Sequence, residues 1–78
     1  MGEQKIKQDE IKIGENIRSI RKSRGLGQKQ LVSQLQLNGI VITRETLVKI
    51  ERGIQHIQAT QLRAIRDALG TSYDDLFK

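Results

Sequence analysis

Basic side chains are the residues of this sequence whose type and spacing can do chemistry. Between Gly14 and Gly53, eight arginines and lysines stand against three glutamates, whereas the segments on either side each hold three basic and three acidic residues. The whole net charge of +5 therefore lies in the middle of the chain. A concentrated positive field attracts polyanions, because phosphate contacts release bound counterions. The pattern indicates nucleic-acid binding, with a solubilising surface as the alternative.

Catalytic and metal-binding chemistry have little support in these residues. The chain has no cysteine and one histidine, His56, so a zinc site would have to use carboxylates. Its serines lie in no nucleophile motif, and no base with an orienting acid is placed beside one. We therefore expect no enzyme activity, no catalytic residue, no metal, no cofactor and no small-molecule substrate.

The length predicts one domain with a modest core, since the chain has only 78 residues. We expect a flexible N-terminal flank over residues 1–12 and a single domain over residues 13–78. The first residues do not resemble a signal peptide, and no apolar run is long enough to span a bilayer. We expect a cytoplasmic protein without a membrane partner.

Helical spacing of apolar residues runs through almost the whole domain. Ile13, Ile17 and Ile20 predict a first helix that stops near Arg24-Gly25, and Leu31, Val32 and Leu35 mark a second from Gln28 to about Leu37. Thr43 is a good N-cap for a third helix that continues to Arg52. Leu62, Ile65 and Leu69 mark a fourth helix, for which Thr60 is a better cap than Gln58. A capping-box pattern from Ser72 to Asp75 marks a short fifth helix.

The connection between the second and third helices is long and apolar. It covers residues 36–42 and contains Asn38-Gly39, a strong turn signal. Four of its residues are too apolar for an exposed loop, so we expect them to pack against the domain or to form an added wing: Leu37, Ile40, Val41 and Ile42.

Five short helices with tight connections, and a basic pair in the middle, are typical of an all-α helix-turn-helix domain. From about Ile13 to Phe77 the sequence resembles the phage-repressor and Cro (Xre-type) family of helix-turn-helix regulators. The resemblance depends on the order and spacing of a few short motifs: Ile17-Arg18-Ser19-Ile20-Arg21, Gln28-Lys29-Gln30-Leu31, Ile50-Glu51-Arg52-Gly53, Ala68-Leu69-Gly70 and Asp75-Leu76-Phe77. It implies a compact, lambda-repressor-like DNA-binding domain of bacterial or phage type.

The resemblance implies that the third helix, residues 43–52, enters the major groove of duplex DNA. Its outward residues are the candidates for base contacts: Arg44 and Lys49 toward guanine, Glu45 toward cytosine, and Val48 toward a thymine methyl. A solvated helix face on which Glu45 and Lys49 form an i,i+4 ion pair is the alternative, and the two interpretations are compatible.

Two further sets of residues follow from the resemblance. Five residues are candidates for phosphate contacts, which set register rather than sequence preference: Gln28, Lys29, Thr43, Arg52 and, as a loop histidine, His56. Arg21 and Glu51 match a partly buried ion pair of the family, so we assign both to structure rather than to binding.

The sequence departs from the family in ways that bear on how the third helix is held. Val32 stands where the family has a small residue, and the connection is longer than the usual turn of about 3–4 residues.

The predicted function is sequence-specific DNA binding by a transcriptional regulator, acting as a homodimer on a palindromic site. Candidate dimer surfaces are Tyr73, Leu76, Phe77 and the apolar connection. A protein-interaction or antitoxin-type module with the same fold is the alternative.

Overall fold

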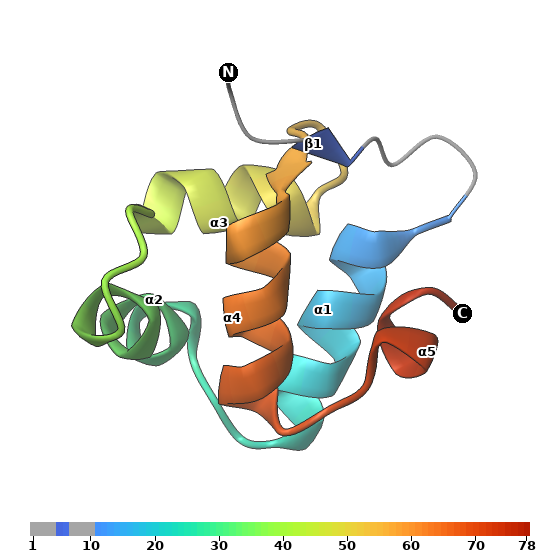
Figure 1. Ribbon diagram of the computed structural model, residues 1–78. Coiled ribbons are helices and arrows are strands. Elements are labelled where there is room, and N and C mark those ends of the chain that lie inside the picture. The colour runs from blue at the N-terminus through green and yellow to red at the C-terminus, as the bar shows by residue number, and fades with distance from the viewer. Residues whose placement is uncertain (1–4, 7–10) are drawn as a thin grey trace.

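The apolar side of each helix turns toward one core in the computed structural model, which describes residues 5–6 and 11–78. The described chain forms five helices and two very short strands: β1 Lys5–Ile6, α1 Ile13–Ser23, α2 Gln28–Leu37, α3 Arg44–Glu51, β2 Ile57–Gln58, α4 Ala59–Leu69 and α5 Tyr73–Leu76 (Figure 1). The predicted all-α class with about five short helices is confirmed.

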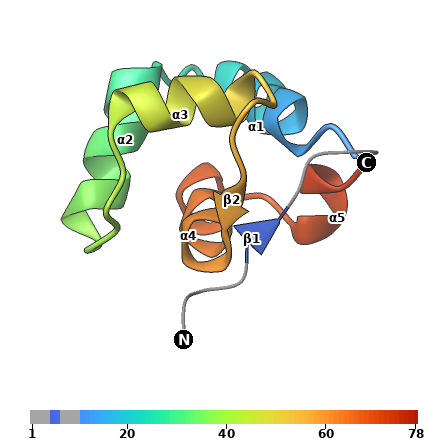
Figure 2. The ribbon, with the colours of Figure 1, turned by 90° about the horizontal axis from the view of Figure 1, so that it is seen from above.

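The helices surround α4, and α3 lies along one side of the molecule. α3 packs against both α1 and α2, α4 packs against α2, and α5 packs against α1. Figure 2 shows α2, α3 and α1 following one another along the top of the view, with α4 below them. Consecutive helices α2 and α3 therefore present one continuous surface away from α4.

Buried apolar side chains from every helix form the core. Thirteen of them lie in the described residues: Ile13, Ile17, Leu31, Val32, Leu35, Ile42, Leu47, Ile50, Ile57, Leu62, Ile65, Leu69 and Leu76. Val32, the residue that replaces a smaller one of the family, is 6% exposed. Leu76 is fully buried, so it belongs to the core and is not available as part of a dimer surface.

Helix starts follow local hydrogen bonds. The hydroxyl of Thr43 accepts from the Thr46 amide at 3.2 Å, and that of Ser72 accepts from the Asp75 amide at 3.1 Å, as capping predicts. Thr60, the better of the two candidate caps for α4, is not the N-cap, because the helix begins at Ala59. Gln58 is its N-cap, and the side-chain oxygen of Gln61 accepts from the Gln58 amide at 3.0 Å.

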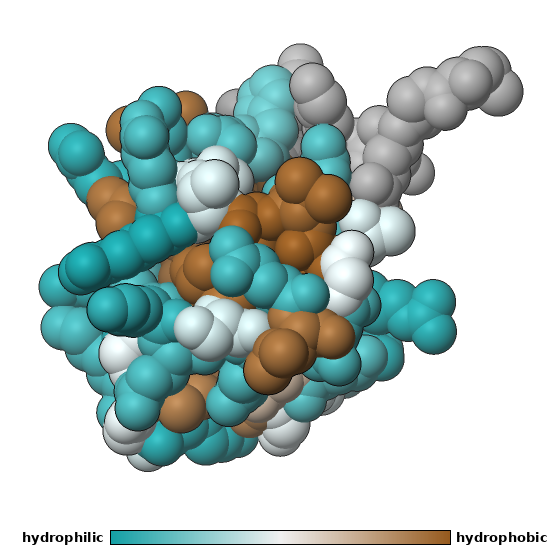
Figure 3. Space-filling model, turned by 90° about the vertical axis from the view of Figure 1, so that its left-hand side faces the viewer, coloured by the Kyte–Doolittle hydropathy of each residue, from teal (hydrophilic) through white to brown (hydrophobic). Residues whose placement is uncertain are grey.

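The α2–α3 connection is only partly packed, in contrast to the expectation from its composition. Ile42 is 3% exposed and Ile40 packs against the core, but Leu37 is 86% and Val41 is 92% exposed. Gly39, at φ +80°, ends α2 in a left-handed conformation that only glycine adopts at little cost. Figure 3, seen from the side of α2, shows apolar residues gathered in the middle of this face.

A pairing of β1 with β2 was not predicted from the sequence. The two strands are antiparallel, with Lys5 opposite Gln58 and Ile6 opposite Ile57. The flexible flank predicted over residues 1–12 includes β1, while residues 1–4 and 7–10 lie outside the described residues, so that expectation stays a prediction. Over the described part of the chain, no helix has the length and apolar character needed to cross a membrane.

Candidate nucleic-acid interface

Helix α3 has one buried side and one exposed side. Leu47 and Ile50 are fully buried, which fixes the rotation of the helix about its axis. Arg44, Glu45 and Lys49 are exposed as a result, and Val48 is half-buried beside them. The four residues predicted to contact bases therefore lie together at the surface.

An exposed ion pair spans this face of α3. The Lys49 ammonium lies 3.1 Å from a carboxylate oxygen of Glu45, with the two side chains 46% and 78% exposed. An i,i+4 pair in water stabilises a helix by about 0.2–0.5 kcal/mol, so it opens at little cost. Both side chains can thus reach a ligand, and Arg44 forms no ion pair with any described residue.

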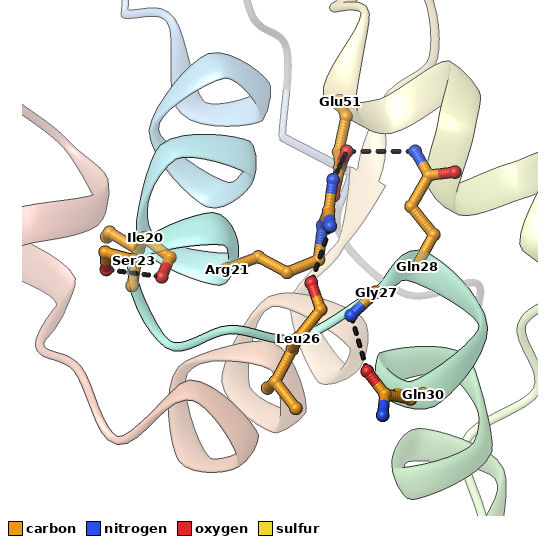
Figure 4. Close-up of polar contacts among 8 residues, drawn as sticks. All are labelled: Ile20, Arg21, Ser23, Leu26, Gly27, Gln28, Gln30 and Glu51. Atoms are coloured by element: carbon orange, nitrogen blue, oxygen red, sulfur yellow. Dashed lines mark hydrogen bonds and ion pairs between the residues drawn. The ribbon is translucent and has the colours of Figure 1, made fainter.

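A buried ion pair holds the other end of α3. The Arg21 guanidinium donates from Nε to Glu51 Oε2 at 2.7 Å and from Nη2 to Oε1 at 2.9 Å, with the side chains only 7% and 2% exposed (Figure 4). Its third nitrogen, Nη1, donates to the Leu26 carbonyl at 2.7 Å. This arrangement ties α3 to α1 and to the segment before α2, as the assignment of both residues to structure implies.

Gln28 completes this network rather than standing free in the first turn of α2. Its amide nitrogen donates to Glu51 Oε1 at 3.1 Å, and its amide oxygen points away from that carboxylate in Figure 4. The start of α2 is held further by the Gln30 side chain, which accepts from the Gly27 amide at 2.7 Å. The α2 amino terminus is therefore fixed against the end of α3, and Lys29 beside it is exposed.

A groove of about 690 Å³ lies where α1, the start of α2 and the second half of α3 meet. Residues from all three helices line it: Glu15, Arg18, Ser19, Lys22, Gln28, Val48, Glu51 and Arg52. Two of these cations, Arg18 and Lys22, were not among the predicted site residues. Their spacing of four on the polar face of the first helix is the signal that was available, but only the fold shows that this face borders α3.

The remaining predicted contact residues are spread along the same chain segment. Thr43 is exposed at the start of α3, and Arg52 is exposed at its end, on the groove. His56 is exposed in the loop after α3, where it borders a separate hollow of about 360 Å³ with Gln55 and Gln58. In the described part of the chain, no three His, Cys, Asp or Glu residues gather as a metal site would require.

Shifts in pKa occur away from this surface, near the end of the chain. The carboxylate of Asp67 accepts from Arg66 and raises the pKa of that guanidinium. The Lys78 ammonium lowers the pKa of Asp75, with smaller contributions from the hydroxyls of Ser72 and Thr71. Neither Arg66 nor Asp75 lines the groove beside α3.

Two helices joined end to end against a shared core, with the second exposing a polar face, define a helix-turn-helix protein. The model of the family described as "Helix-turn-helix domain" matches residues 14–78, and this chain belongs to that family. The family predicted from the sequence motifs is thereby confirmed.

Two solved structures share the fold. One is the clp gene regulator ClgR from C. glutamicum, with a TM-score of 0.74 and 24% identity over 85% of this chain and 78% of that chain. The other is the restriction-modification controller protein C.AhdI from Aeromonas hydrophila, with a TM-score of 0.74 and 24% identity over 86% of this chain and 94% of that one. None of the curated proteins matches the chain.

Proposed function

We propose that this protein binds double-stranded DNA sequence-specifically and regulates transcription, with α3 inserted in the major groove. The observation that carries the proposal is the division of α3 into two sides. One side is fixed by the core and by the Arg21–Glu51 pair, while the other presents a row of polar side chains to solvent. A rigid helix with an exposed polar face is what base readout requires.

In this proposal the outward face of α3 reads base edges. Arg44 pairs bidentately with guanine, Lys49 reaches a guanine acceptor about one turn further along, and Glu45 accepts from cytosine N4. Val48 packs against a thymine methyl. Binding opens the Glu45–Lys49 ion pair, which the exposure of both side chains makes inexpensive.

Phosphate contacts place α3 in the groove without reading sequence. We assign them to exposed or half-buried residues around α3 and at the start of α2: Gln28, Lys29, Thr43, Arg52 and His56. The side-chain nitrogen of Gln28 donates to Glu51, and its side-chain oxygen cannot donate to a phosphate, so we assign the phosphate contact of Gln28 to the backbone amides of the α2 amino terminus.

We propose a homodimer on a palindromic site, because two-fold symmetry lets two copies of α3 read half-sites about one helical turn apart. Tyr73 and Phe77 are the candidate dimer surface at α5: their rings stack with centroids 6.1 Å apart, and Phe77 is 40% exposed. The shared fold with the clp gene regulator ClgR and with a restriction-modification controller supports the regulatory role. The place of action would be the cytoplasm, where bacterial or phage DNA lies.

Selection of bound duplexes from a random pool tests this proposal. The wild-type chain is expected to enrich one palindromic motif, and two chains are expected to sediment with each duplex. Arg44→Ala with Lys49→Ala should abolish enrichment, whereas the control pair Arg63→Ala with Lys78→Ala, which removes the same charge from α4 and the chain end, should retain it. No enriched motif with the wild type, or the same motif with the Arg44 and Lys49 variant, would contradict the proposal.

A protein-interaction module, of adaptor or antitoxin type, is the second candidate function. It is favoured by Leu37 and Val41, whose side chains are 86% and 92% exposed. Figure 3 shows apolar residues gathered on the face seen from the side of α2, and a contiguous apolar patch at a surface marks a protein contact. The duplex selection separates the two candidates: no enriched sequence favours this one, and a motif that depends on Arg44 and Lys49 favours the first.

A further inference from the structure

The groove beside α3 contains more positive charge than its neighbours in the fold neutralise. Arg18, Lys22 and Arg52 line it, and none of them forms an ion pair with a described residue. Near the end of the chain, by contrast, two cations are paired: Arg66 lies 2.7 Å from Asp67, and Lys78 lies 3.0 Å from Asp75. Three cations without an ion pair therefore lie together along this groove.

The acidic residues of the groove do not cancel this charge. Glu51 is fully occupied by Arg21 and Gln28 and is 3% exposed. Glu15 is the one exposed carboxylate in the lining. Three open cations against one open carboxylate leave the groove positive, at a place bordered by Val48 on the outward side of α3.

The position of this groove, between α1 and α3, suits a DNA strand that runs beside the major groove. A helix in the major groove of DNA has a sugar–phosphate backbone on each flank. Because α1 packs directly against α3, it lies on the side where one of these backbones would run. Arg18 and Lys22 are four residues apart, about 6 Å along the axis of α1. Such a row reaches more than one phosphate of one strand, because phosphates of a strand follow each other every 3.4 Å along the duplex axis.

We infer that α1 supplies phosphate contacts in addition to those around α3. Arg18 and Lys22 bind the backbone of one DNA strand along the protein groove between α1 and α3, while α3 reads the bases; we call these two residues the phosphate row. The inference depends on the proposed binding to duplex DNA and extends it to a helix outside the helix-turn-helix pair. The row fixes the depth and tilt of α3 in the major groove and leaves sequence preference to α3, since phosphate contacts carry no base information.

The salt dependence of affinity tests this inference. Each phosphate contact contributes about 0.9 to the slope of log affinity against log salt concentration. Arg18→Gln with Lys22→Gln is expected to reduce the slope by about 1.8 while keeping the selected motif. The control, Arg63→Gln with Lys78→Gln, changes net charge equally on other surfaces and should keep the wild-type slope. Circular dichroism melts verify that both pairs fold.

Each outcome separates the two proposals. A wild-type slope in the Arg18 and Lys22 variant overturns the phosphate row, and so does an equal loss of slope in the control pair, which would mean a general effect of net charge. An enriched motif in the wild type with an unchanged slope in the variant rejects the row alone. If the wild type enriches no motif, the regulatory proposal fails, and the slopes measured on random duplex still decide whether α1 binds phosphate.

Discussion

At the scale of single residues, Glu51 is the side chain on which the position of α3 depends most. Its carboxylate accepts from Arg21 twice and from Gln28 once, while almost no solvent reaches it. An arginine suits this place better than a lysine, because its planar group donates two parallel bonds to one carboxylate and a third to the Leu26 carbonyl. One residue near the end of α3 therefore joins three helices.

Removing Glu51 should destabilise the domain strongly. Glu51→Ala leaves the Arg21 guanidinium buried without its partner, at an expected cost of about 3–5 kcal/mol in the free energy of unfolding, measured by urea denaturation. Replacing both residues by leucine should recover most of this loss, since it buries no charge. Lys49→Ala, which breaks only the exposed pair, should cost less than about 0.5 kcal/mol. A Glu51→Ala loss as small as that of Lys49→Ala would contradict the account.

The pKa of Asp75 gives a second prediction at this scale. Lys78 stabilises the charged carboxylate, so the folded-state pKa lies below the ordinary value of 3.8. The associated stability is present above the unfolded-state pKa and disappears as the pH falls through the folded one. Lys78→Ala should raise the pKa of Asp75 in an NMR titration, whereas Lys49→Ala should not move it. An unchanged value in the Lys78 variant would show that the ion pair is not formed in solution.

At the scale of elements, α3 is a short helix that depends on its cap. The Thr43 hydroxyl satisfies the Thr46 amide, and α3 spans only eight residues. Thr43→Ala should reduce the free energy of unfolding by about 0.5–2 kcal/mol. Thr43→Asp should keep the cap, because aspartate accepts the same bond, but should weaken DNA binding by repelling phosphate. Equal DNA affinity of the Asp variant and the wild type would place Thr43 outside the interface.

The α2–α3 connection offers two adjacent residues with opposite roles. Ile42 is buried and Val41 is 92% exposed, so Ile42→Ala should cost about 2–5 kcal/mol and Val41→Ala should change stability by less than about 0.5 kcal/mol. Urea denaturation of both variants measures this difference. A large loss for Val41→Ala would mean that this face is covered in solution, by a second copy or another protein.

The sequence predicts those parts of the fold and of the candidate site that depend on residues close together in the chain. Thr43, Ser72 and the apolar spacing identify α3 and α5, because caps and helical periodicity act within a few residues. The β1–β2 pair joins segments about fifty residues apart and is two residues long, so it leaves no periodic signal. Gln61 fixes the start of α4 through one hydrogen bond that residue preferences do not specify. Arg18 and Lys22 join the candidate site only because α1 packs on α3.

At the scale of the whole molecule, charge is divided between surfaces. The last part of the chain is neutral, and several of its charges are neutralised in pairs, Arg66 with Asp67 and Lys78 with Asp75. The net charge of +5 belongs to residues 14–53, which form α1, α2 and α3. Those three helices lie along one side of the molecule (Figure 2), so its field has a direction. A directed field steers a polyanion to that side before any specific contact forms.

The central claim, that the outward face of α3 reads bases, is tested most directly by the ratio of affinities for the selected duplex and a scrambled duplex of equal length at one salt concentration. We predict a ratio of about 10³ or more for the wild type. Arg44→Ala with Lys49→Ala should lower it by at least about tenfold, since a bidentate base contact contributes about 1–3 kcal/mol of discrimination. A ratio near one for the wild type, or one that the double substitution leaves unchanged, would contradict the claim.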